Sequence, residues 1–204
     1  MVTAIPGTIQ FWFDFSSPYG YFASHRIGRI AADAGRSVVW KPFMLASVFK
    51  ETGARPMLEV PLKGTYCLHD WDRLGRLYGL PWALPERFPI AATAATRAFY
   101  WIEANAPELA ERFARACFDA YYGAGRNLMR AEVLASIAEA LGIDSAALLA
   151  AVEQPQWKER AKDEGSEAVR RGVVGSPYFI ADGEGFWGHD RLDMLAEWLR
   201  RGTW

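Results

Sequence analysis

Ser16, Ser17 and Pro18 stand where an apolar strand, predicted over residues 9–15, meets a predicted helix. Proline is favoured at the first position of a helix, and a serine before it can cap the helix with its hydroxyl. Backbone N–H groups and the positive end of the helix dipole meet at such a start and stabilise a bound anion. A thiolate is such an anion, so the junction has the chemistry to hold one beside Ser17.

A plain N-cap is the alternative role for Ser17, and a second motif favours the chemical role. Ser176 and Pro177 precede a predicted strand over residues 178–181. In thioredoxin-like folds a proline there takes the cis form and faces the start of the first helix, and the residue before it offers backbone groups to a bound peptide. The two motifs have the layout of a thioredoxin-type active site, with serines in place of cysteines. The thiol must then arrive on a small molecule, for which glutathione is the candidate.

The first segment of the chain has the pattern of a β-α-β unit. Apolar residues recur at helical spacing from Pro18 until Gly35 ends the helix, and residues 37–41 form a second predicted strand. A unit this compact predicts two parallel strands joined by a right-handed crossover.

The last segment returns to strand character. A turn over residues 182–185 joins the strand at 178–181 to a short strand at 186–187. A final helix follows, with Asp190 predicted as its N-cap and Asp193 completing a weak capping box.

Helical periodicity dominates the chain between these two segments. Neither terminal segment is large enough to fold alone, so we expect them to share one sheet. The predicted organisation is a discontinuous thioredoxin-like domain, residues 1–47 and 173–204, with an all-α domain inserted at residues 48–172. The fold class is α/β.

Composition excludes several classes of function. The 204 residues are 51% hydrophobic and 23% charged, with a net charge of −1, so no global field attracts nucleic acid or an anionic membrane. No apolar stretch approaches a membrane span, and residues 1–7 have no secretory pattern, which predicts the cytoplasm. Cys67 and Cys117 lie far apart and are expected to be reduced, buried thiols, with no metal cluster. Nine tryptophans suit either an aromatic core or a ring-lined cavity.

Motifs along the whole chain resemble the 2-hydroxychromene-2-carboxylate isomerases. This family is related to the kappa-class glutathione transferases within the DsbA-like thioredoxin group. The motifs are residues 13–19, residues 63–66 with Asp70 and Arg73, residues 84–89, residues 175–177 and residues 186–192. The resemblance implies a DsbA-like fold and glutathione as cofactor.

The resemblance also implies roles for individual residues. Ser17 would be the catalytic residue, its hydroxyl facing the glutathione sulfur, while Ser176 beside Pro177 would pair through its backbone with the cysteinyl part. The γ-glutamyl end would be held by a further stretch, comprising Trp187, Gly188, His189 and Asp190. Asp190 can accept hydrogen bonds from the ammonium group.

Three other residues are candidate ligand contacts. Lys50 and Lys63 could bind the substrate carboxylate or the glycyl end of glutathione, although a solvated lysine is the default for either. In the prediction Lys63 is assigned to glutathione and Lys50 to the substrate. Phe88 matches an aromatic position near the family's substrate pocket, with core packing as its alternative.

The activity implied is a glutathione-dependent isomerisation of 2-hydroxychromene-2-carboxylate-like substrates to trans-o-hydroxybenzylidenepyruvate in the degradation of aromatic compounds. A kappa-type transferase and a non-catalytic glutathione- or peptide-binding protein are the alternatives. A dithiol oxidoreductase is disfavoured because no cysteine lies at Ser16, Ser17 or in the following turn. Relatives suggest a homodimer.

Overall fold

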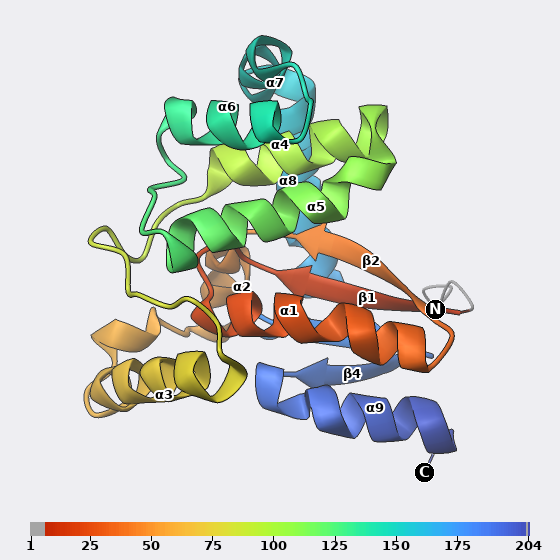
Figure 1. The fold of residues 1–204 in the computed structure, drawn as a ribbon. Coiled ribbons are helices and arrows are strands. Elements are labelled where there is room, and N and C mark those ends of the chain that lie inside the picture. Colours follow the sequence, from red (N-terminus) through yellow and green to blue (C-terminus); the bar gives the residue numbers. More distant parts are fainter. Residues whose placement is uncertain (1–6, 203) are drawn as a thin grey trace.

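A mixed four-stranded sheet forms the centre of the computed structural model, which describes residues 7–202 and 204 (Figure 1). The strands are β1 (Thr8–Phe13), β2 (Ser37–Pro42), β3 (Tyr178–Ala181) and β4 (Glu184–Trp187), in the spatial order β2-β1-β3-β4. β1 pairs in parallel with β2 and antiparallel with β3, and β4 is antiparallel to β3. The predicted parallel unit is confirmed, and segments from the two ends of the chain share one sheet.

Helices cover both faces of this sheet. On one face lie α1 (Pro18–Asp33), which connects β1 to β2, and α9 (Leu192–Arg201). β1 shows why both faces are covered, because its side chains alternate between two apolar clusters. Phe11 and Phe13 pack in the larger cluster, whereas Trp12 points into a smaller one beneath the helices of the other face.

The residues between β2 and β3 form helices, as their periodicity predicts. The helices are α2 (Leu45–Thr52), α3 (Lys63–Tyr78), α4 (Thr93–Asn105), α5 (Pro107–Phe118), α6 (Ala131–Ala140), α7 (Ser145–Val152) and α8 (Pro155–Arg170). Short 3-10 turns occur at Met57–Glu59 and His189–Arg191, and a π-helical turn spans Asp119–Gly123. The helical insertion is confirmed, while the exact domain boundaries stay a prediction; the one after residue 47 falls inside α2.

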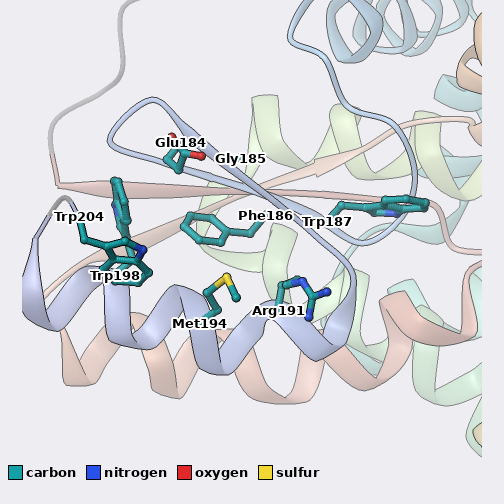
Figure 2. A pocket seen from close by; sticks show the side chains of 8 residues that line it. All are labelled: Glu184, Gly185, Phe186, Trp187, Arg191, Met194, Trp198 and Trp204. Carbon is teal, nitrogen blue, oxygen red and sulfur yellow. The ribbon is translucent and has the colours of Figure 1, made fainter.

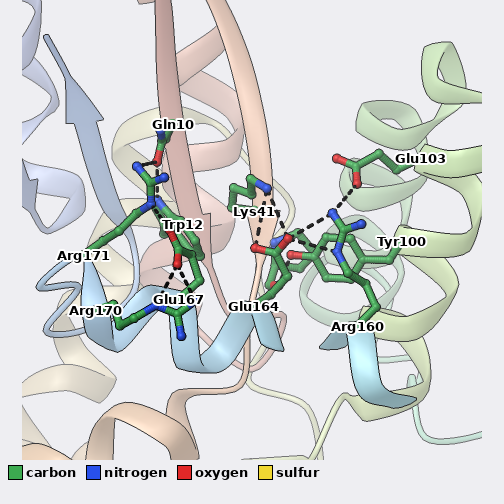
Figure 3. Close-up of polar contacts among 11 residues, drawn as sticks. Gln10, Trp12, Lys41, Tyr100, Glu103, Arg160, Glu164, Glu167, Arg170 and Arg171 are labelled. Atoms are coloured by element: carbon green, nitrogen blue, oxygen red, sulfur yellow. Dashed lines mark hydrogen bonds and ion pairs between the residues drawn. The ribbon is translucent and has the colours of Figure 1, made fainter. Parts of the chain in front are cut away.

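A network of charged side chains joins α8 to the sheet and to α4 (Figure 3). The buried carboxylate of Glu164 accepts hydrogen bonds from Lys41 on β2, at 3.2 Å, and from Arg160. Arg160 also reaches Glu103 on α4, at 3.2 Å, and stacks over the ring of Tyr100. Burial of Glu103 raises the pKa of its carboxyl. Removal of one partner would leave a buried charge uncompensated, so the network holds α8 in one place.

Two sequence predictions at the C-terminal end are corrected. The hairpin turn has two residues, Asp182 and Gly183, both with positive φ, and β4 already begins at Glu184. Asp190 does not cap α9: it lies in a 3-10 turn, and the N-cap position falls on Arg191 without a side-chain cap bond. Asp193 pairs with Arg26 instead of completing a capping box.

Many rings, among them Trp71 and Trp82, pack against one another in the core, whereas Trp187 and Trp204 are exposed. Cys67 and Cys117 are both free and buried, as predicted. Within residues 7–202 and 204, no helix combines the length and apolar character needed to cross a bilayer. The predicted lack of a secretory pattern concerns residues that lie almost entirely outside the described part.

Candidate active site

Ser17 is fixed at the start of α1 by two hydrogen bonds. Its Oγ accepts from the N–H of Gly20 at 3.1 Å, which makes Ser17 the N-cap, and donates to the carbonyl of Ser176 at 3.0 Å. The side chain is 4% exposed. The N–H of Tyr19, in the first turn of α1, forms no hydrogen bond within the described chain. A hydroxyl that can rotate its hydrogen and a free N–H therefore meet at the positive end of the α1 dipole.

The loop opposite Ser17 contains Ser176 and Pro177, joined by a cis peptide bond as predicted. The Ser176 hydroxyl accepts from the N–H of Asp14 at 2.9 Å, so this loop is tied to the end of β1. Among the described residues the N–H of Ser176 has no partner, and its carbonyl retains a second lone pair. Ser176 thus presents one donor and one acceptor to an extended peptide.

Residues 187–190 approach the same loop. The N–H of Gly188 donates to the carbonyl of Pro177 at 2.9 Å. Gly188 has a φ of 108°, and a Cβ atom there would lie 2.4 Å from Oδ1 of Asp190. The Asp190 side chain is 60% exposed and, among the residues that the structure describes, pairs only with Arg191, at 3.2 Å. Its carboxylate is therefore available to a ligand ammonium group.

The side chain of Trp187 lies against Gly175, because a Cβ on Gly175 would meet the indole nitrogen at 2.4 Å. Trp187, Arg191, Trp198 and Trp204 are among the residues that line a groove of about 400 Å³, and Figure 2 shows their side chains. Neither Ser17, Ser176 nor Pro177 lines this groove, so it includes the predicted ligand contact Trp187 but does not reach Ser17.

Tyr19 links three parts of the site, a role that sequence reasoning did not assign to it. Its hydroxyl donates to Asp70 on α3 at 2.8 Å, and Asp70 in turn pairs with Arg73 at 2.5 Å. The ring of His189 stacks on the Tyr19 ring at 5.0 Å between centroids. Burial and the Asp70 carboxylate raise the pKa of Tyr19, while burial lowers the pKa of His189, which favours neutral rings at pH 7. The signal in the sequence that could have indicated this role of Tyr19 was the motif that contains Asp70 and Arg73.

The remaining predicted contacts lie at different distances from the candidate site. Phe88 packs edge-on against Trp71, in a loop that is tied to Ser16 by a 3.0 Å bond from Ile90 N–H. Lys63 begins α3, one turn before the residues that touch Tyr19, and is exposed. Lys50 is exposed in the last turn of α2, and nothing in the structure brings it to Ser17.

Gly20 occupies the position three residues after Ser17, where a C-x-x-C motif has its second cysteine. A Cβ atom on Gly20 would lie 3.2 Å from the Cβ of Ser17 and 3.4 Å from the ring of Phe118. Of the two cysteines, Cys117 is fully buried, and the sulfur of Cys67 lies 3.9 Å from the Tyr19 hydroxyl. Burial raises the pKa of both thiols. Neither has the environment of a reactive cysteine.

Comparison with known proteins gives consistent matches over the whole chain. Residues 8–200 match the model of the DSBA-like thioredoxin domain. A 2-hydroxychromene-2-carboxylate isomerase from Sphingobium xenophagum is 28% identical over 194 residues, covering 94% of this chain and 97% of that protein. Glutathione S-transferase kappa 1 from Rattus norvegicus is 24% identical over 203 residues, covering 94% of this chain and 90% of that protein.

A solved structure of a 2-hydroxychromene-2-carboxylate isomerase superposes with a TM-score of 0.87 at 28% identity and covers 95% of both chains. The predicted resemblance and the predicted fold class are both confirmed. The chain belongs to the DSBA-like thioredoxin domain family.

Proposed function

We propose that the protein is a glutathione-dependent isomerase, which converts 2-hydroxychromene-2-carboxylate-like compounds to trans-o-hydroxybenzylidenepyruvate-like products in aromatic-compound degradation. The observation that carries this proposal is the Ser17 hydroxyl at the start of α1, 3.0 Å from the Ser176 carbonyl. The isomerase relative at 28% identity supports this reaction. The kappa relative, named a glutathione transferase, supports glutathione as the cofactor.

The residues present fit glutathione. An extended cysteinyl unit needs one backbone donor and one acceptor, which Ser176 offers beside Pro177. The γ-glutamyl ammonium needs a carboxylate, and that of Asp190 is exposed. The sulfur needs donors and a positive potential, which the Ser17 hydroxyl, the Tyr19 N–H and the α1 dipole supply.

Bound glutathione would supply a thiolate that adds reversibly to a conjugated double bond, so that this bond can rotate before it re-forms. The chain's own contribution is to hold the sulfur as an anion at pH 7. For this the hydrogen of Ser17 turns from the Ser176 carbonyl towards the sulfur, a rotation about one bond. In this proposal Phe88 packs against a flat substrate ring, while Lys50 attracts the substrate carboxylate and Lys63 the glycyl end of glutathione.

The main alternative is a kappa-type transferase, which the relative at 24% identity favours. The same sulfur position would then conjugate glutathione irreversibly to a small electrophile. A thioredoxin-like protein that binds glutathione or a peptide without chemistry is the third candidate.

One assay separates these candidates. Purified protein is mixed with glutathione and 2-hydroxychromene-2-carboxylate, product is followed by absorbance, and free thiol is titrated at intervals. An isomerase forms product only when glutathione is present and leaves the thiol concentration constant. A transferase consumes thiol with an electrophile such as 1-chloro-2,4-dinitrobenzene. Glutathione binding without either reaction identifies the third candidate. Absence of glutathione binding excludes both enzymes and leaves only a peptide-binding protein.

A homodimer is part of the proposal and rests on the resemblance alone. Sedimentation velocity tests it directly, since a chain of 22.9 kDa and its dimer differ twofold in mass.

A further inference from the structure

Asp14 follows the last residue of β1 and is buried, with 4% of its surface exposed. Its Oδ1 accepts a hydrogen bond from the N–H of Ser16 at 2.8 Å, and its Oδ2 accepts one from the N–H of Leu45 at 2.7 Å. Its backbone N–H donates to Ser176, and its carbonyl accepts from the N–H of Ser17 at 2.9 Å. One residue therefore bonds both sides of the candidate active site and the start of α2.

One of the two carboxylate bonds supplies a cap that the local sequence does not provide. The N-cap position of α2 is Met44, which has no side-chain cap bond, so Asp14 supplies the acceptor for Leu45 from another segment. Only a carboxylate has two oxygens that can each accept from a separate N–H. An asparagine of the same shape would present an NH2 group to one of the two donors.

The two accepted N–H groups couple the turn before Ser17 to the start of α2. Ser16 precedes Ser17 in the turn that enters α1, and the same turn bonds to the carbonyl of Asp14. A shift of this turn moves the Ser17 hydroxyl relative to Ser176, and a shift of a few tenths of an ångström weakens a hydrogen bond measurably.

No cation neutralises the Asp14 carboxylate among the described residues. The titratable groups that face it are the hydroxyls of Tyr121 and Tyr122, on the π-helical turn, and both remain protonated at neutral pH. α2 contributes the N–H of Leu45 as a donor to the carboxylate, whereas the Ser176 hydroxyl accepts from the backbone N–H of Asp14. Burial raises the pKa of Asp14 to about 6, although the two N–H groups act in the opposite direction.

We propose that Asp14 is a positioning residue that sets Ser17 opposite Ser176 by holding the N–H groups of Ser16 and Leu45, so that glutathione binding requires its ionised carboxylate. This inference rests on the proposed glutathione function. A protonated Asp14 turns one oxygen into a donor, which leaves one buried N–H without its acceptor and loosens the turn before α1.

The pH dependence has a definite sign. The pKa of Asp14 in the folded protein lies above the ordinary value of 3.8, so the folded state binds this proton more tightly than the unfolded state. The contribution of Asp14 to the free energy of unfolding therefore increases as pH falls from about 6 to about 4. Glutathione affinity decreases over the same range. A loss of binding in this range that came from unfolding would show the opposite trend in stability.

Binding is measured by calorimetry with S-methylglutathione, whose sulfur cannot ionise, at values from about pH 5 to about pH 8. For the wild-type protein we expect affinity to fall by up to about tenfold for each unit below pH 6. Asp14→Asn should bind S-methylglutathione about tenfold more weakly at pH 8. It should also lose the acid limb, by which we mean the fall in affinity below about pH 6. His189 is retained in both proteins, so their difference isolates Asp14.

The matched control is Asp144→Asn, because Asp144 also accepts a backbone N–H at a helix start, that of Ala147 at 3.0 Å. This residue caps α7, away from the site, and asparagine is an equally good cap. The control should keep both the affinity and the acid limb of the wild-type protein.

A second measurement uses the wild-type protein alone, in case Asp14→Asn does not fold. The backbone amide resonances of Ser16 and Leu45 should titrate together with a midpoint near 6, the pKa of Asp14. If glutathione binds but these amides do not titrate, or Asp14→Asn keeps the acid limb, the role of Asp14 is refuted and the proposed function stands. If the wild-type protein binds neither glutathione nor S-methylglutathione, both proposals fall.

Discussion

The starts of α1 and α9 carry the same sequence signal but differ in structure. Each is preceded by a residue type that commonly caps helices, Ser17 and Asp190. Ser17 takes the cap position and bonds to the N–H of Gly20, whereas Asp190 stands in a 3-10 turn and bonds to no helix N–H. The two starts are neighbours, since the rings of Tyr19 and His189 stack between them.

The difference shows how a helix start can serve a ligand in two ways. At α1 the capping hydroxyl is buried and held at a fixed place, which suits a group that must meet a reacting sulfur. At α9 the 3-10 turn after Gly188 leaves the Asp190 carboxylate exposed and without a capping bond. This suits a group that must pair with a mobile ammonium. Substitutions at the two starts should therefore separate stability from binding.

The largest effect is expected for Ser17→Ala. Loss of a hydroxyl that stabilises the sulfur anion should lower kcat by about 100-fold. Loss of the cap should lower the free energy of unfolding by about 1 kcal/mol. Steady-state kinetics and urea unfolding measure the two effects.

Ser24→Ala is the control for Ser17→Ala, because Ser24 is also buried in α1 and bonds to a backbone carbonyl, that of Tyr21. Turnover equal to the wild type in Ser17→Ala, or an equal loss in Ser24→Ala, would remove Ser17 from the reaction.

A smaller effect is expected for Gly188→Ala. Alanine would be strained at the φ of 108° that Gly188 adopts, and its methyl group would clash with the Asp190 carboxylate. We expect glutathione affinity to fall about tenfold as Asp190 is displaced. Gly35→Ala is the control, since Gly35 has a φ of 64° with nothing within 4 Å of the added Cβ. Calorimetry should find unchanged affinity in the control; an equal loss in both would show that backbone strain alone is responsible.

The smallest effect, and the sharpest comparison, is expected for Asp190→Ala. Removal of an exposed carboxylate partner should weaken glutathione binding by about threefold to tenfold. The free energy of unfolding should change by less than about 0.5 kcal/mol, because no cap is lost. Asp144→Ala, which removes a true N-cap, should cost about 1 kcal/mol. Equal losses of stability in the two variants would contradict the structure of the α9 start.

Local signals predicted the elements and the two halves of the site. The serine-proline pair at the start of α1 and the proline before β3 each depend on neighbours in the chain, so their roles could be read from the sequence. The apolar run of β1 and the helical spacing of the insertion depend in the same way on residues a few positions apart.

Contacts between distant segments could not be predicted in this way. The bond from Asp14 to Ser176 spans 162 residues, and that from Tyr19 to Asp70 spans 51. The cap expected at Asp190 failed because a 3-10 turn, which follows the positive φ of Gly188, moves the N-cap position of α9 from Asp190 to Arg191. Short polar motifs predict a helix start better than they predict which residue caps it.

The space beside Ser17 also bears on disulfide chemistry at the start of α1. The Cβ atoms of a disulfide lie about 3.5 to 4.5 Å apart, and the Cβ of Ser17 lies 3.2 Å from the position that a Cβ on Gly20 would take. Cysteines at both places would require a shift of only a few tenths of an ångström to form a bridge. A pair of cysteines able to form a disulfide is therefore two substitutions away, at positions that this sequence fills with serine and glycine.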